Sequence, residues 1–183
     1  MKISRPNPDE YADYYGKYIA YVQTDDPLKE LRKSKEKLMK FISKLSKKEL
    51  KHRYAEGKWS IKEILVHLVD AERIWGYRAL RVARNDKTPL PGWEENDYAP
   101  ASKADDRKIK SILREFETVR NASVALFEGF EEEMLMRTGT ASNHPISVRA
   151  LAYVMMGHQL HHVSVIKERY LNPDYRVAEE DRR

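Results

Sequence analysis

The spacing of residues near the C-terminus restricts the fold of this chain more than any other feature. Between residues 147 and 170 a mostly apolar series recurs at intervals of 3, 4, 3, 4, 3 and 4, through Val148, Leu151, Met155, His158, His162, Val165 and Arg169. This rhythm is typical of the inward-facing side of a helix and not of the alternation of a strand. It predicts a helix over 147–170 that ends before Asn172 and Pro173.

The same spacing predicts four further helices and no convincing strand. They are expected over 8–23, 28–45, 61–84 and 106–131. The third begins where Ser60 and Glu63 match a capping box.

Two connections interrupt this pattern. The segment 85–105 holds three prolines and a glycine, and loops of such length are often functional. Trp93 and Tyr98 in it either close over a pocket or pin the loop to the helices. Residues 137–145 are expected to form a turn.

Four long helices with moderate connections predict an all-α fold, a four-helix bundle with an additional short N-terminal helix. The 183 residues fit one domain, 1–183, at about 150 residues per domain. The charged tail from about residue 173 is expected to be flexible.

Composition excludes several classes of site. The chain has no cysteine, which excludes disulfides, thiolate zinc sites and cysteine nucleophiles. No apolar run approaches the ~20 residues of a membrane helix, and the first residues do not resemble a signal peptide. A cytoplasmic protein without a membrane partner is therefore expected.

The net charge of +5 comes from a local basic stretch. Residues 29–53 carry eleven Lys or Arg against three acids, yet Leu31, Leu38 and Ile42 recur at helical spacing within it. Most of the lysines therefore fall on the opposite, solvated face of an amphipathic helix. Since no nucleic-acid-binding motif accompanies the charge, no nucleic-acid partner is expected.

Three histidines are candidate metal ligands. His158 and His162, four residues apart, lie on one helix face and can present two imidazoles to one ion. His67 follows the apolar line of its own helix and is expected to face the interior. Each alone fits a buried, neutral histidine, but several buried imidazoles are costly without partners, and one ion resolves all of them. The predicted ligands are His67, His158 and His162.

The remaining candidates carry weaker signals. His161 lies roughly 60° around the helix from His158 and fits either a pocket residue or plain packing. His52 and His144 are expected at the surface. Asp70, one turn after His67, either orients that imidazole, acts as a base or faces solvent. Catalytic and cofactor-binding residues stay unassigned.

The donor set restricts the metal. Three imidazoles suit zinc, nickel, copper or iron rather than magnesium or calcium, and we expect one divalent transition metal ion, zinc or nickel first. A di-iron site requires paired ExxH motifs, and the chain offers only Glu49 and His52 in the lysine-rich stretch.

Two stretches carry a resemblance to a known family. GKWSIKEILVHLVDAERIWGYRALRVARNDKTPLPG around His67 and ALAYVMMGHQLHHVSVIKERYL around His158 and His162 resemble the DinB/YfiT-like superfamily. The resemblance implies a metal-binding four-helix bundle with a histidine triad, often dimeric, so a homodimer is expected. It also implies a metal-dependent hydrolase or, as in some branches, a transferase or isomerase that uses a low-molecular-weight thiol such as bacillithiol or mycothiol.

The ligand set leaves three functions open. Three neutral imidazoles do not compensate a divalent charge, so a bound water would be acidified towards a pKa of about 7, or a thiol bound as thiolate. The first outcome predicts a hydrolase acting on a small-molecule substrate through a metal-bound water, and the second an S-transferase using a low-molecular-weight thiol. The third is a non-catalytic metal or small-molecule binding protein.

Overall fold

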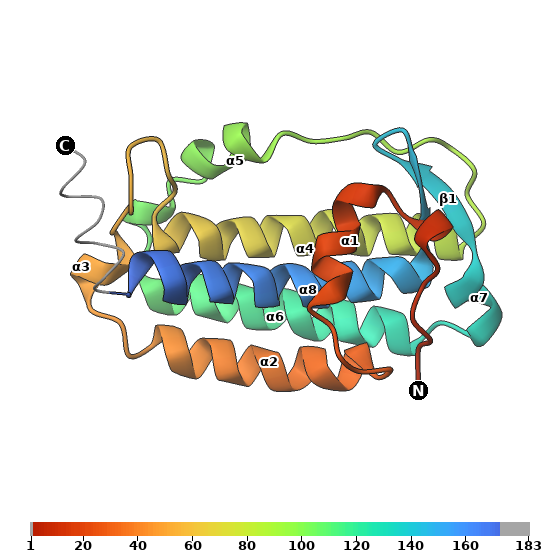
Figure 1. Ribbon diagram of the computed structural model, residues 1–183, viewed down its shortest axis with the longest axis horizontal. Coiled ribbons are helices and arrows are strands. Elements are labelled where there is room, and N and C mark those ends of the chain that lie inside the picture. The colour runs from red at the N-terminus through yellow and green to blue at the C-terminus, as the bar shows by residue number, and fades with distance from the viewer. Residues whose placement is uncertain (1, 173–183) are drawn as a thin grey trace.

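Four long helices form a bundle in the computed structural model, which describes residues 2–172 (Figure 1). They are α2 (Pro27–Ile42), α4 (Ile61–Ala83), α6 (Ile109–Glu128) and α8 (Val148–Val165). The predicted four-helix bundle is thus confirmed. The tail expected from about residue 173 lies outside the described residues. Within residues 2–172, no helix is both long and apolar enough to cross a membrane.

The order of the helices explains the long connection in the middle of the chain. Both α4 and α2 pack against α6 and α8, so α4 lies diagonally opposite α2. In Figure 1, α4 and α6 run in one direction along the bundle, and α2 and α8 run in the other. Because α4 and α6 are parallel neighbours, the chain between them must return along the bundle. This return spans about the length of α4, which is about 35 Å for 23 residues.

Short elements complete the fold. Segment 85–105 is more ordered than expected, since it contains α5 (Glu95–Ala101) and part of a 3₁₀ turn, η2 (Ala104–Asp106). The expected first helix is split because Tyr11 and Ala12 have extended backbones. The other short elements are the 3₁₀ turn η1 (Pro8–Glu10), α1 (Asp13–Ala20), α3 (Lys47–Leu50), α7 (Glu132–Met136) and a π-helical turn after α8, η3 (Ile166–Tyr170).

A small hairpin stands where only a turn was expected, so the prediction of no strand is wrong at this point. Strand β1 (Thr138–Ala141) pairs antiparallel with β2 (His144–Ser147). The turn residues Ser142 and Asn143 have φ of 52° and 65°, as a two-residue hairpin turn requires. Leu90 from the long connection lies alongside, donating to the Thr140 carbonyl (2.9 Å) and accepting from the Ser142 N–H (3.0 Å). Strands of four residues are too short to show alternation in the sequence.

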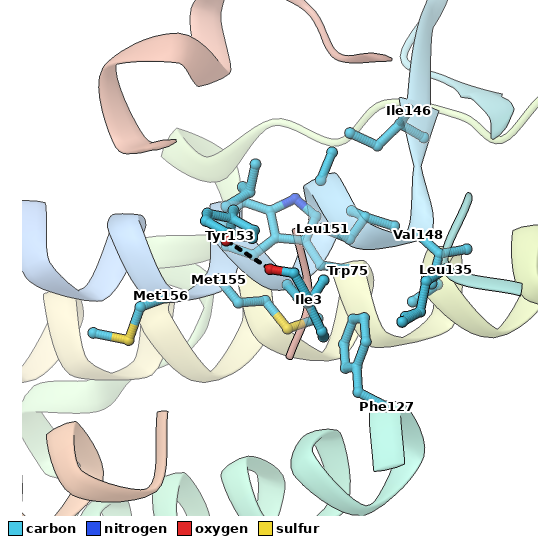
Figure 2. Close-up of a cluster of buried hydrophobic side chains, with 14 of the residues drawn as sticks. Ile3, Trp75, Phe127, Leu135, Ile146, Val148, Leu151, Tyr153, Met155 and Met156 are labelled. Atoms are coloured by element: carbon cyan, nitrogen blue, oxygen red, sulfur yellow. Dashed lines mark hydrogen bonds between the residues drawn. The ribbon is translucent and has the colours of Figure 1, made fainter. Parts of the chain in front are cut away.

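The apolar core ties the N-terminal segment to the bundle (Figure 2). Trp75, Phe127 and Leu151 are buried there together with Ile3. The Tyr153 hydroxyl donates to the Ile3 carbonyl at 2.7 Å, which satisfies a polar group that is buried in the core.

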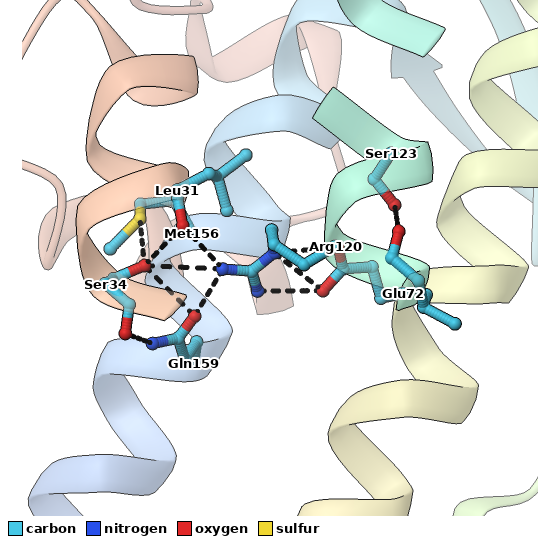
Figure 3. Close-up of polar contacts among 8 residues, drawn as sticks. Leu31, Ser34, Glu72, Arg120, Ser123, Met156 and Gln159 are labelled. Carbon is cyan, nitrogen blue, oxygen red and sulfur yellow. Dashed lines mark hydrogen bonds and ion pairs between the residues drawn. The ribbon is translucent and has the colours of Figure 1, made fainter. Parts of the chain in front are cut away.

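A buried polar network joins all four long helices (Figure 3). Arg120 of α6 forms a bidentate pair with Glu72 of α4, at 2.8 Å from both Nε and Nη2. Its Nη1 donates to the Leu31 carbonyl, to Ser34 Oγ on α2 and to Gln159 Oε1 on α8. Such a network stabilises the fold only when every polar group in it has its hydrogen-bond partner. It therefore restrains α4 and α8 relative to each other.

Candidate metal centre

The predicted ligands come from the two antiparallel helices α4 and α8. The start of α4 is set by a reciprocal cap: the Glu63 N–H donates to Ser60 Oγ (3.1 Å), and the Ser60 N–H donates to Glu63 Oε2 (2.7 Å). His67 lies about two turns into the helix, on its buried face. His158 is buried and His162 half-buried, one turn apart on α8.

The structure brings these three side chains together. The Nε2 atom of His158 lies 3.0 Å from Nε2 of His67 and 3.0 Å from Nε2 of His162. The three donor atoms all lie within 4.8 Å of one another. Nitrogens bound to one tetrahedral zinc at 2.0–2.1 Å are about 3.3 Å apart, so the spacing is close to that of a ligand set.

Burial keeps the three imidazoles neutral. It lowers the pKa of His67 to about 4. Burial, and then the neighbouring imidazoles, lower the pKa values of His158 and His162 well below the ordinary value. Neutral imidazole is the form that binds a metal.

The contacts also fit a metal better than a hydrogen-bonded cluster. A ring nitrogen offers one proton or one in-plane lone pair, so His158 Nε2 cannot make two good hydrogen bonds at once. A cation between the three lone pairs resolves this conflict.

Aromatic packing, and not a hydrogen bond at Nδ1, orients the ring of His67. The Nδ1 atoms of His67 and His162 are buried and have no hydrogen-bond partner among the described residues. The ring of His67 packs against Trp59 (centroids 4.7 Å apart) and against Trp93 (5.7 Å, nearly parallel at 22°). The interpretation of Asp70 as the group that orients His67 is therefore wrong. Asp70 is half-buried 3.8 Å from Arg73, and burial raises its pKa.

A cavity of about 510 Å³ opens at the triad, within the usual size of small-molecule sites. Its wall is mainly aromatic, and Glu95 is the only carboxylate in it among the described residues. Besides the triad, the lining consists of Ala12, Tyr14, Tyr15, Tyr18, Trp59, Trp75, Trp93, Glu95, Ala141, Ser142 and His144.

Helix α1 supplies the tyrosine wall. Tyr18 packs its ring edge-on against His158, with centroids 5.0 Å apart, and its hydroxyl lies 2.8 Å from that of Tyr14. Burial, and then the hydrogen bond to Tyr14, raise the pKa of Tyr18, so its hydroxyl stays protonated. The close approach depends on Gly157, where a Cβ would collide with the Tyr18 carbonyl.

The other three histidines lie outside the triad, although His161 is in ring contact with His162. His161 is half-buried against the rings of Tyr18 and Tyr21. His52 was expected at the surface, but it is half-buried against Tyr170. His144 is exposed, as expected, and also lines the cavity.

Sequence reasoning missed much of the wall. The tyrosines of α1 were not identified as site residues from the sequence, although Tyr14, Tyr15 and Tyr18 share one helix face, a usable signal. Trp93 was expected either to close over a pocket or to pin the loop to the helices. It does both, since it packs on His67 and lines the cavity. Ser142 and Glu95 gave no signal, because only tertiary packing brings their segments to α4 and α8.

The fold and the site define a class of protein: helical bundles in which three histidines from two helices meet at a cavity. Residues 30–166 match the model of the DinB superfamily, and the chain belongs to this family.

Among the proteins similar to this chain are one from Oceanobacillus iheyensis and one from Bacillus subtilis. One, from Oceanobacillus iheyensis, is named "Putative metal-dependent hydrolase" and is 25% identical over 142 residues, which cover 76% of this chain and 81% of that protein. The other is a solved structure described as "YfiT from Bacillus subtilis is a probable metal-dependent hydrolase with an unusual four-helix bundle topology". It superposes with a TM-score of 0.68 at 16% identity, over 91% of each chain, which supports the fold.

Proposed function

We propose that this protein binds one divalent transition metal ion through His67, His158 and His162 and acts as a metal-dependent hydrolase on a small molecule. One observation carries the proposal: three neutral imidazole nitrogens converge within 4.8 Å at the wall of a cavity. The name of the Oceanobacillus iheyensis relative is consistent with it. Zinc and nickel are the metals that we propose first, because the donors are all imidazoles.

A divalent ion held there would polarise a bound substrate and lower the pKa of a coordinated water towards 7. The chain itself supplies position and environment. Trp59 and Trp93 both pack against the ring of His67. Burial raises the pKa of Tyr18, so its hydroxyl stays protonated. Because the Tyr14 and Tyr18 hydroxyls share one hydrogen bond, the pair has one hydrogen left to donate to a substrate oxygen.

An S-transferase that uses a low-molecular-weight thiol such as bacillithiol is the second candidate. The cavity favours it in one respect, since about 510 Å³ has room for more than one small reactant. Non-catalytic binding of a metal or small molecule is the third.

Metal analysis tests the site. We expect about one equivalent of metal per chain in the purified protein and a large loss in His67→Ala, His158→Ala and His162→Ala. His161→Ala is the matched control, because His161 neighbours the triad but packs on Tyr18 and Tyr21. Unchanged metal in all three triad variants would contradict the proposal.

Activity assays separate the reactions. Metal-loaded protein is incubated with an ester panel and with an alkylating electrophile, each with and without bacillithiol. Hydrolysis without thiol supports the hydrolase, and conjugation only with thiol supports the transferase. Metal binding without either activity supports the binding protein.

A further inference from the structure

One buried arginine beside the cavity, Arg78, has no negative partner among the described residues. Three arginines are buried among the described residues. Arg120 pairs with Glu72, and Arg149 pairs with Glu10. Arg78 of α4 is 2% exposed, and no carboxylate of residues 2–172 forms an ion pair with it.

Within residues 2–172, the hydrogen bonds of Arg78 all go to neutral oxygens. Its Nη2 donates to the Pro91 carbonyl at 2.8 Å and to Ser142 Oγ at 3.0 Å. Its Nη1 lies 3.5 Å from the Tyr15 hydroxyl, at the limit of hydrogen bonding. A buried charge is costly unless it is paired, so this guanidinium has hydrogen bonds but lacks a counter-charge.

The partners of Arg78 connect it to the cavity, since Ser142 and Tyr15 both line the wall. The oxygen of Ser142 accepts from Arg78, which leaves its hydroxyl hydrogen free to donate to a ligand. The position of Ser142 is set by the hairpin turn and by its own N–H, which donates to the Leu90 carbonyl. Glu95, the carboxylate of the wall, forms no ion pair with Arg78 in the described part of the chain.

We propose that Ser142 and Tyr15, backed by Arg78, bind a carboxylate group of the small-molecule substrate. This inference deepens the proposed function and rests on it for the role of the ligand as substrate. Arg78 acts as a positioning residue, and the hydroxyl of Ser142 makes the direct contact. A carboxylate matches the single uncompensated charge, whereas a phosphate monoester would bring close to two negative charges.

Ligand binding to metal-free protein tests the subsite without depending on the triad. After chelator treatment, the probes are 3-phenylpropionate, 3-phenylpropionamide and 2-phenylethyl phosphate. They are titrated at pH 7.5, where the buried histidines are neutral. The fluorescence of Trp59, Trp75 and Trp93, which line the cavity, reports binding. Since hydrogen bonds to charged groups contribute about 1.5–3 kcal/mol, we expect the carboxylate to bind roughly 10-fold or more tightly than the amide.

The variants assign this preference to Arg78 and Ser142. Arg78→Gln removes the charge and is expected to abolish the preference, and Arg78→Lys to restore part of it. Ser142→Gly removes the hydroxyl at a position of positive φ that glycine adopts without strain, and is expected to reduce the preference about 3-fold or more. Circular dichroism checks that each variant is folded. If Arg78→Gln does not fold, the result for Ser142→Gly tests the proposal.

Lys17→Gln is the matched control. Lys17 is another cation near the cavity, with Nζ 4.0 Å from the centre of the Tyr14 ring. It forms no hydrogen bond with Arg78 or Ser142 in the described part of the chain. Its loss is expected to leave the preference intact.

Four results would overturn the subsite: equal binding of acid and amide, no binding of either, stronger binding of the phosphate, or a preference lost in Lys17→Gln but kept in Ser142→Gly. None of these results depends on metal content. A triad that binds no metal would contradict the proposed function and leave the carboxylate preference measurable.

Discussion

The Nε2 atoms of His67 and His158 lie 3.0 Å apart although 91 residues separate the two histidines in the chain. Burial keeps both imidazoles neutral, so the contact joins two groups that compete for a proton or share a cation. The stability of the bundle should therefore depend on what lies between them.

Metal removal should destabilise the protein. A ligand that binds only the folded state at 100 times its Kd stabilises by about 2.7 kcal/mol. We expect addition of zinc or nickel to chelated protein to raise the Tm in calorimetry. His158→Ala should abolish the rise and His161→Ala should retain it. An equal rise in wild type and His158→Ala would place the binding elsewhere.

Glu72→Gln should destabilise the bundle strongly. The side chains of Arg120 and Glu72 are 1% and 4% exposed, so the substitution leaves a buried guanidinium without its counter-charge. The expected loss in the free energy of unfolding is about 3–5 kcal/mol, measured by urea denaturation. Glu128→Gln, which breaks the exposed pair with Arg32, should cost less than about 1 kcal/mol. Similar losses in the two variants would refute this account.

Two glycine-to-alanine substitutions should change the stability of the fold in opposite directions. Gly157→Ala forces a Cβ into the Tyr18 carbonyl, so α1 must move away from α8, at a cost of about 1–3 kcal/mol. Gly76→Ala meets nothing within 4 Å in the middle of α4 and should stabilise by roughly 0.5–1 kcal/mol. Thermal unfolding of both variants measures the difference. A neutral Gly157→Ala would show that the contact between α1 and α8 is loose.

The pair of Glu10 and Arg149 should contribute stability that depends on pH. Burial alone would raise the pKa of Glu10, but hydrogen bonds from Arg149, the Asn7 backbone and Ser147 lower it to about 2, against an ordinary 4.5. A lowered carboxyl pKa stabilises the fold above the unfolded value and ceases to do so as pH falls through the folded value. At pH 6 we expect the free energy of unfolding of the wild type to exceed that of Glu10→Gln by on the order of 2 kcal/mol, measured by urea denaturation. This difference should disappear as the pH falls from about 4.5 to 2. A gap that stays constant with pH would contradict this role for Glu10.

Local patterns predicted most of the fold and the three candidate metal ligands. The 3-4 spacing on α8 and the capping box of Ser60 and Glu63 are local, because a helix places residues three and four apart on one face wherever it lies. For this reason the sequence alone predicted the four long helices and the inward His67, His158 and His162. Even so, it did not predict the hairpin, whose strands are four residues long.

Tertiary structure decided how these elements meet. The parallel arrangement of α4 and α6 brings the long connection back over the site, so that Trp93 reaches His67 and Pro91 reaches Arg78. Gly157 lets α1 place Tyr18 against His158. Whether a charge such as that of Arg78 is compensated depends on segments distant in the chain, and no local spacing encodes that. The sequence by itself determined which residues face the interior, and the packing of distant segments determined the cavity that they share.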